Sequence, residues 1–419
     1  MIELLAQGRI TNPVLNSKIG NLPGGSYPTG LQLMLRNLIN IAFGIAGIYF
    51  FYFAYLGAFA PYFSLYLNAL GITAVGIGVI MALPQLVRIF APHLWGWLAD
   101  RGGRRLRVAR IGTVIGAVVY CGLFAARGFE SLFAVVLLMS FFLSAALPLV
   151  EVTTLAHLGE HTAQYGRIRV WGSVGFIAAV LVVGYVLDWL PIGVLLWIML
   201  AILIGIVTLL LLVPEAPQLE HVHDHVPIAH VVRQPQVVAL IAACALMAVA
   251  HGPYYTFYSI YLVGFGYTKG AVGWLWALGV ICEIAIFFWM SHLFRAYTLR
   301  QVLIASFALA ALRFLIIAWC ADSLALLLFA QTLHAASFGS FHAAALGYVH
   351  RFFRGRNQAR GQAIYTSLTF GFGGTLGGLY AGYTWERFGA GITFTGAALC
   401  AFAGMALLWL KLDDQKAAR

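Results

Sequence analysis

The stretch that decides the fold is Gly96 to Arg110, which reads GWLADRGGRRLRVAR. A long apolar run ends at Asp100, and the next begins at about Val108. The arginines between and beside these runs are Arg101, Arg104, Arg105, Arg107 and Arg110. Short loops rich in Lys and Arg stay on the cytoplasmic side of a membrane. The stretch therefore predicts a tight cytoplasmic hairpin, and this assignment sets the orientation of the whole chain.

The composition is that of an integral membrane protein. Of the 419 residues, 62% are hydrophobic and 9% are charged, and the mean hydropathy is +0.89. In soluble domains, about a quarter of the residues are charged. No stretch is long and polar enough for a separate soluble domain, which argues against an enzyme acting outside the bilayer. The net charge of +11 comes from short loops, so we interpret it as a topology signal and lipid contact, not as a nucleic-acid site.

Cysteine and histidine patterns do not indicate a metal site or a cofactor. The five cysteines lie inside apolar stretches without paired spacing, as expected of small buried side chains. The segment that follows the sixth apolar run carries four histidines, at His221, His223, His225 and His230. Imidazoles bind zinc or nickel, but this spacing is not that of a closed structural site. We predict no metal ligands and no cofactor.

Apolar runs separated by Gly, Pro or charge predict twelve all-α membrane spans. The first six are 41–67, 74–99, 106–126, 131–157, 166–187 and 191–213, and the second six are 236–264, 270–294, 299–319, 323–350, 359–385 and 390–411. The predicted organisation is an N-terminal extension (1–35), a six-helix bundle (36–213), a cytoplasmic linker (214–235), a second six-helix bundle (236–411) and a cytoplasmic tail (412–419).

The expected topology places both termini in the cytoplasm of a cell with the chain in its inner membrane. The predicted cytoplasmic connections carry most of the arginines, whereas the opposite side has only Arg127, Lys269 and Arg387. We expect the first thirty-odd residues to be poorly ordered, and we expect the native product to begin at or near Met34, which opens the first span. N-terminal mass analysis that finds earlier residues would contradict that start.

The two halves of the chain repeat at a constant offset of 195 positions, as from Tyr66 to Tyr261. The stretch SLYL at 64–67 matches SIYL at 259–262, and further Gly, Thr and Tyr positions keep the same register. Two bundles in the same orientation imply a pseudo-twofold axis along the membrane normal. A substrate site near the midplane and alternating access by rocking follow from that arrangement.

The opening stretch resembles the loop 2–3 motif of the major facilitator superfamily. The matching positions are Gly96, Leu98, Ala99, Asp100, Arg101, Gly103, Arg104 and Arg105. The resemblance covers 41–411 and implies the major facilitator fold, with this loop as a conformational latch. The expected roles are close helix packing at Gly96, a helix cap from Asp100, and contacts of the arginines with lipid phosphate or acids.

Charges inside spans are costly and mark functional positions by default. Arg88 in the second span and Glu283 in the eighth are related by the same offset of 195. One interpretation is a structural ion pair between the halves. The other places both on a central cavity, with Arg88 as substrate anchor and Glu283 as proton carrier.

The region around Glu151 and Arg169 resembles helices 4 and 5 of the lactose permease and its oligosaccharide:proton symporter relatives. That resemblance implies that Glu151 and Arg169 bind substrate. Snorkelling of Arg169 to the membrane surface is the alternative. Arg313 and His334 resemble the proton-coupling residues of the same group, and His342 lies two helical turns beyond His334.

One departure matters for coupling. Ser337 stands where those symporters carry an acid one turn after the histidine, so the proton must reside elsewhere, and Glu283 is the nearest acid.

Spans 1 and 7 are rich in aromatic residues, and one set could line a cavity for an aromatic substrate. The set is Tyr62, Tyr66, Tyr258 and Tyr261.

The strings PYFSLYL at 61–67 and LPQLVRIFAPHLWGWLADR at 83–101 resemble the phenylpropionate-permease branch of the superfamily. This resemblance predicts a proton-coupled importer of a small organic solute such as an aromatic carboxylate, with protons and the lipid bilayer as further partners and a monomer as the working unit. A sugar or nucleoside proton symporter and a drug exporter remain as alternatives, and a membrane sensor or scaffold is the alternative from another class.

Overall fold

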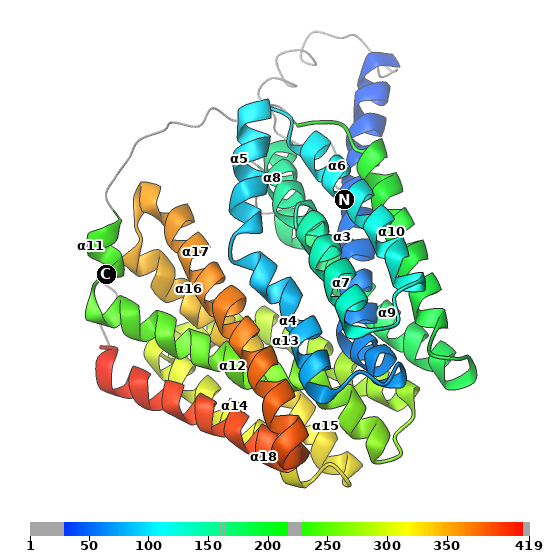
Figure 1. Ribbon diagram of the computed structural model, residues 1–419. Coiled ribbons are helices and arrows are strands. Elements are labelled where there is room, and N and C mark those ends of the chain that lie inside the picture. Colours follow the sequence, from blue (N-terminus) through cyan, green and yellow to red (C-terminus); the bar gives the residue numbers. More distant parts are fainter. Residues whose placement is uncertain (1–28, 160, 162–163, 217–227, 414–419) are drawn as a thin grey trace. The chain divides into compact units, whose positions relative to one another are not determined.

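The computed structural model describes residues 29–159, 161, 164–216 and 228–413, and this described part is helical without strands (Figure 1). The chain forms two units, Met1–Phe43 and Gly44–Arg419, and every candidate site residue lies in the second. The helices of the first half are α3 (Thr29–Ala69), α4 (Ala74–Arg88), α5 (Ala91–Gly102), α6 (Arg105–Tyr120), α7 (Phe129–Leu143), α8 (Ala146–Leu158), α9 (Tyr165–Trp189) and α10 (Val194–Leu212). Those of the second half are α11 (Ala229–Val232), α12 (Pro235–Gly264), α13 (Lys269–Ala296), α14 (Leu299–Trp319), α15 (Leu324–Thr332), α16 (Phe341–Phe352), α17 (Gln358–Thr366) and α18 (Gly374–Lys411).

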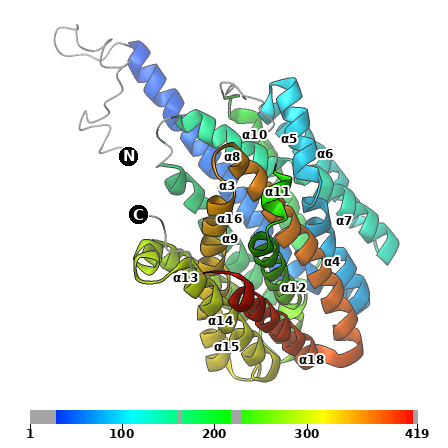
Figure 2. The same ribbon diagram turned by 90° about the vertical axis from the view of Figure 1, so that its left-hand side faces the viewer.

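Eleven helical stretches of the described chain are long and apolar enough to cross a membrane. The last, Gln358–Lys411, has 54 residues, whereas one crossing needs about 20. Its backbone leaves the helical region at Gly389, where φ is 76°. The orange and red parts of α18 run in different directions on either side of this bend (Figure 2). The stretch therefore supplies two crossings, which confirms the predicted all-α membrane fold. The predicted bundle and linker boundaries stay predictions.

Two predicted spans are broken in the middle, and a proline explains each break. Span 2 divides into α4 and α5 around Ile89 and Phe90, with Pro92 in the first turn of α5. Pro92 has no N–H to donate to the carbonyl of Arg88, the residue one turn before it. Span 4 divides into α7 and α8 in the same way before Pro148. The breaks place Arg88 at the end of one helix segment and Glu151 in the first turns of another.

Two further spans contain a π-helical turn. Ala335–Ser340 separates α15 from α16, and Ser367–Gly373 separates α17 from α18. Turns of this kind occur often at functional sites, because the extra residue per turn redirects the side chains that follow. The first begins directly after His334, so the helix changes its winding between His334 and His342.

The second unit has two ends. We call the end with the loops at 70–73, 125–128, 190–193 and 265–268 the far end, because it lies opposite the Arg-rich loop that joins α5 to α6. The two halves meet where α4 contacts α18 and α9 contacts α13. Glycines permit these contacts: a Cβ on Gly78 would lie 2.7 Å from the carbonyl oxygen of Gly378.

Candidate functional site

A close polar contact inside the second unit joins Glu283 of α13 to His334, which lies between α15 and the π-helical turn. The carboxylate Oε1 and the imidazole Nε2 are 2.7 Å apart, with 16% and 6% of the two side chains exposed. The other ring nitrogen of His334 has no hydrogen-bond partner among the described residues. A carboxylate and an imidazole at this distance share a proton, so the pair is a place where a proton can be held away from bulk water.

Arg313 of α14 lies beside this pair and is completely buried. Its guanidinium carbon is 4.2 Å from the centre of the Tyr254 ring, and its Nη2 donates to the side-chain oxygen of Gln331 at 3.4 Å. Its charge acts on both Glu283 and His334. A buried cation this close interacts with any charge that the carboxylate or the imidazole carries. Arg313 therefore affects when the pair can take or lose a proton.

Gln331 is a site residue that the sequence did not reveal. It accepts from Tyr254 at 3.2 Å and donates to Tyr258, so it joins these two buried side chains to Arg313. Nothing in a single sequence separates this glutamine from one that only fills space.

An aromatic stack connects His334, just before the π-helical turn, to His342 of α16. The ring centres of His334 and Phe338 are 5.5 Å apart, and those of Phe338 and His342 are 6.4 Å apart, with nearly parallel planes in both pairs. The charge of Glu283 also acts on His342. His334 and His342 thus lie on one face of the helix, and this face is turned towards Glu283.

Glu151 and Arg169 are neighbours in the first half. Nε of Arg169 is 3.9 Å from Oε1 of Glu151, and about a third of each side chain is exposed. The guanidinium lies 4.1 Å from the centre of the Phe53 ring, and Tyr165 donates to Glu151 at 3.5 Å. A planar cation stacked on one ring keeps N–H groups on its edge that can bind an oxyanion or sugar hydroxyls.

Arg88 lies between the charges of the two halves. Its charge acts on the hydroxyl groups of Tyr52 in α3 and Tyr255 in α12. Tyr52 is also within the influence of Glu151 and Arg169, and Tyr255 within that of Glu283 and Arg313. Among the residues that the structure describes, no ion pair joins Arg88 to Glu283. Tyr52 and Tyr255 instead lie within electrostatic range of Arg88 and of the charges of one half each.

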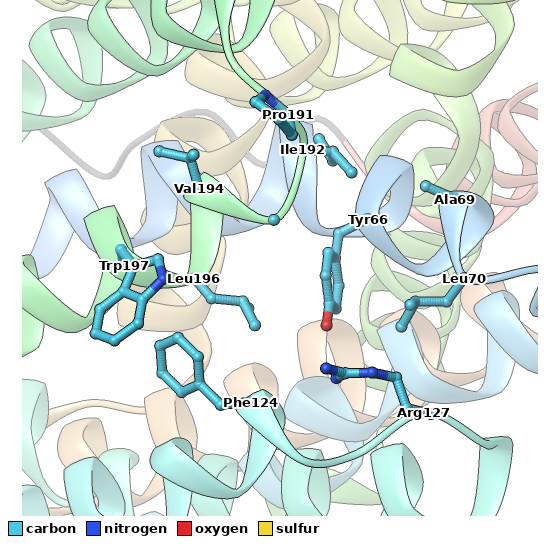
Figure 3. A pocket seen from close by; sticks show the side chains of 11 residues that line it. Tyr66, Ala69, Leu70, Phe124, Arg127, Pro191, Ile192, Val194, Leu196 and Trp197 are labelled. Carbon is cyan, nitrogen blue, oxygen red and sulfur yellow. The ribbon is translucent and has the colours of Figure 1, made fainter.

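The four tyrosines selected from the sequence do not come together around one cavity. Tyr62 donates to the carbonyl of Val180 at 2.6 Å, Tyr258 belongs to the Gln331 network, and Tyr261 donates to the carbonyl of Ala318 at 2.9 Å. Tyr66 faces a different cavity of about 480 Å³ at the far end, where its hydroxyl points towards Arg127 (Figure 3). These residues lie within about two turns of the ends of α3 and α12. Of the four, Tyr258 reaches the network of the buried Arg313, through Gln331.

Depth along the spans is the signal that points to Tyr52 and Tyr255 instead. Arg88 follows the start of α4 by 14 residues, 88 minus 74, and Glu283 follows the start of α13 by 14, 283 minus 269. The charges act on Tyr52 and Tyr255, which lie deeper in α3 and α12 than the four tyrosines above. Tyr52 is 17 residues before the end of α3 and Tyr255 is 9 before the end of α12, by the same subtraction.

The proposed latch loop has a simple local structure. α5 ends at Gly102, Gly103 takes the left-handed conformation with φ of 62°, and Arg105 lies 3.5 Å from Asp100. Arg101 stacks over Trp97 at 5.4 Å. A Cβ on Gly96 would meet no described atom within 4 Å. The close helix packing expected at Gly96 is therefore not made with any part of the chain that the structure describes.

The described residues contain no group of three or more His, Cys, Asp or Glu side chains placed to hold a metal ion. Three of the linker histidines, His221, His223 and His225, lie outside the described residues. His230 is exposed in α11.

The fold and the buried charges define a class: a multi-pass membrane protein whose polar groups lie inside a helical bundle, as in a transporter. The profile of the MFS_1 like family matches residues 43–396. The chain therefore belongs to the MFS_1 like family, and it is a transporter of the major facilitator type and not an enzyme.

The similar proteins described next are transporters as well. The Escherichia coli (strain K12) protein named "Probable 3-phenylpropionic acid transporter" is 27% identical over 368 residues, which are 86% of this chain and 95% of that protein. The maltose permease of Geobacillus stearothermophilus is 27% identical over 384 residues, 88% of this chain and 94% of the permease. A crystal structure of a variant of the nucleoside transporter NupG matches with a TM-score of 0.79 at 21% identity, over 88% of this chain and 99% of that one. At 21% identity, this structural match supports the fold alone.

Proposed function

We propose that the chain is a proton-coupled importer of a small aromatic carboxylate that works by alternating access. The observation that carries the proposal is the buried pair of Glu283 and His334, which shares its surroundings with Arg313 and, through Tyr255, with Arg88. A carrier of this kind needs one group that gains and loses a proton and one cation that holds an anion, close enough to influence each other.

Arg88 supplies the anchor for the substrate carboxylate. It sits where the proline of α5 interrupts the span, so its side chain is not enclosed by a regular helix on both sides. Tyr52 and Tyr255 lie near it and offer ring faces for an aromatic group. The similarity to the 3-phenylpropionic acid transporter supports a substrate of this chemistry.

The proton step uses Glu283. When Glu283 is protonated, its negative charge no longer repels the substrate anion near Arg88, and the anion binds. Release of the substrate restores the attraction of Arg313 for the carboxylate, so the proton leaves to water on the other side. One proton and one monovalent anion then cross together, and no net charge moves.

A second candidate is a sugar or nucleoside proton symporter. The pair of Glu151 and Arg169 favours it, because a carboxylate and a guanidinium stacked on Phe53 can bind hydroxyl groups by paired hydrogen bonds. The maltose permease is similar over most of both chains. Export of a drug-like solute is the remaining transport alternative.

The test is uptake into proteoliposomes under an imposed proton gradient, with matched panels of aromatic acids, sugars and nucleosides. Gradient-driven accumulation of an aromatic acid, lost in Arg88→Gln and retained in Arg88→Lys, supports the first candidate. Uptake of a sugar or nucleoside that depends on Glu151 and Arg169 but not on Arg88 would replace it with the second.

We further propose that the protein works as a monomer in the inner membrane with both termini in the cytoplasm. The arginine distribution supports this orientation. Protease accessibility of tags at either terminus in right-side-out and inverted vesicles tests it.

A further inference from the structure

Two carboxylates at the far end each bind the start of a helix in the opposite half. Asp188, at the end of α9, accepts from the backbone N–H of Lys269 at 2.7 Å and of Gly270 at 2.9 Å, which are the first residues of α13. Glu386, at the end of the first part of α18, accepts from the N–H of Val75 in α4 at 2.9 Å. The two contacts are reciprocal, because each half provides one acid and one helix start.

Both receiving helices are already capped once by their own threonine. Thr73 accepts from the N–H of Gly76 at 3.1 Å, and Thr268, at the offset of 195, accepts from Ala271 at 3.1 Å. A helix start has four N–H groups without partners inside the helix. The threonine satisfies one of them, and the carboxylate from the other half satisfies one or two more. The negative charge at the positive end of the helix dipole adds to the attraction.

The surrounding contacts bring the backbones close enough for these caps. A Cβ on Gly273 would lie 2.7 Å from the carbonyl oxygen of Val180, so α13 and α9 touch where Asp188 reaches across. Trp274 donates to the hydroxyl of Tyr185 at 2.7 Å next to this point. Tyr62 donates to carbonyls of both halves, at Val180 and Lys269. Other hydrogen bonds between the described halves join His93 and Ile89 of the first half to Ser367 of the second, away from the far end.

We propose that Asp188 and Glu386 are the latch that holds the far end closed, and that opening of this end breaks both caps together. The inference rests on the proposed alternating access and assigns residues to one of its two gates. Both carboxylates are exposed, so water replaces the lost hydrogen bonds when the halves separate. Removal of a side-chain cap changes a helix equilibrium by roughly 2- to 30-fold, a range suited to a contact that must form and break in every cycle.

The experiment measures the distance between the halves at the far end. Spin labels are attached to Asn68→Cys and Phe265→Cys, two exposed positions in opposite halves, in a chain whose five native cysteines are replaced by Ala. Pulsed dipolar spectroscopy in nanodiscs then gives the ratio of closed to open molecules. Asp188→Ala and Glu386→Ala should each lower this ratio by about 2- to 30-fold, and the double variant by the product of the two effects.

The matched control is Glu130→Ala, which removes an exposed acid in the first turn of α7 at the same end but within one half. It should leave the distances unchanged. If an alanine variant fails to give monodisperse helical protein, Asp188→Asn with Glu386→Gln keeps an acceptor oxygen and removes only the charge, and it should give a smaller shift in the same direction. Unchanged distances in the double variant, or an equal shift in the control, would overturn the proposal. The readout needs neither substrate nor proton gradient, so it does not depend on the proposed cargo. If the distance between the two labels at the far end is the same under every condition, that result would instead contradict alternating access itself.

Discussion

The carboxylate of Glu283 and the imidazole of His334 lie 2.7 Å apart inside the bundle, contributed by two helices that are far apart in the chain. Breaking a buried pair by removing one partner leaves the other without compensation and is strongly destabilising. The first two predictions test the proposed role of this pair in proton coupling.

Glu283→Gln should abolish accumulation against a gradient while leaving exchange of substrate across the membrane in place. Glutamine keeps the size and a hydrogen-bond acceptor for His334 but cannot gain or lose the proton. We expect accumulation to fall by roughly a hundredfold, the lower range for loss of a proton-transfer group. Radiolabel accumulation and counterflow in the same proteoliposomes measure the two activities. Glu130→Gln, an exposed acid on α7, is the control, and loss of both activities in Glu283→Gln alone would contradict a coupling role.

The pH dependence of uptake should disappear with the same substitution. In the wild type, uptake of an anionic substrate should increase as the external pH falls, because more molecules carry the proton on Glu283 when they bind the anion. Initial rates across a pH series at constant membrane potential measure this. A Glu283→Gln variant whose exchange rate still follows pH would move the titrating group elsewhere, with His342 as the next residue to change.

Arg88→Gln should weaken binding of an anionic substrate by roughly 10- to 150-fold, the effect of losing a hydrogen bond to a charged group. Arg88→Lys should recover part of the loss because it restores the charge but not the planar geometry. Substrate-induced quenching of tryptophan fluorescence in detergent gives the affinities. Equal affinity in the Gln variant and the wild type would remove Arg88 from the site.

Glu151→Gln should change transport more than stability. The pair with Arg169 is about one-third exposed and long, at 3.9 Å, and partly exposed pairs contribute about 0–1 kcal/mol. We expect a shift of less than about 1 kcal/mol in the free energy of unfolding together with a clear loss of uptake. Urea or thermal unfolding in detergent, run beside uptake, separates the two. A large loss of stability without a change in residual transport would make the pair structural.

Gly252→Ala should destabilise the second half. A Cβ at this position in α12 would lie 2.3 Å from backbone atoms of Gly377 in α18, so one helix must shift. Forcing extra atoms into such a contact costs about 1–3 kcal/mol. Gly96→Ala is the control, because a Cβ there meets no described atom within 4 Å. Thermal unfolding of both variants should show a lowered midpoint for Gly252→Ala only, and an equal midpoint for both would contradict the close packing.

The membrane fold could be predicted from the sequence because it follows from local properties. The length and apolar character of each run predict a span, and the arginines of 101–110 predict its orientation, without any knowledge of contacts. The same holds for the buried charges: Arg88, Glu283 and Arg313 stand out because a charge in a span is rare. The helix breaks at Pro92 and Pro148 were not predicted from the sequence. Each proline leaves one backbone carbonyl without an N–H partner, and that carbonyl has to be located in the folded structure.

The tyrosines show where such reasoning stops. A repeat at a fixed offset selected Tyr66 and Tyr261, but a repeat reports shared ancestry of two positions and not shared surroundings. Tyr66 faces a far-end cavity beside Arg127, and Tyr261 bonds to the carbonyl of Ala318. Asp188 and Glu386 were not selected from the sequence. They are 198 positions apart, 386 minus 188, whereas the repeat relates positions that are 195 apart.

The sequence by itself determined that this chain is a twelve-span transporter with an Arg-rich loop at one end and charges within its spans. Hydropathy, loop charge and the cost of burying ions act residue by residue, so they can be evaluated on a string of letters. Only the tertiary structure decided which groups meet: Glu283 with His334, Arg313 with Gln331, and Asp188 and Glu386 with the helices of the opposite half. Those pairings depend on how helices rotate and tilt against each other, because a turn of one residue moves a side chain by about 100° around its helix.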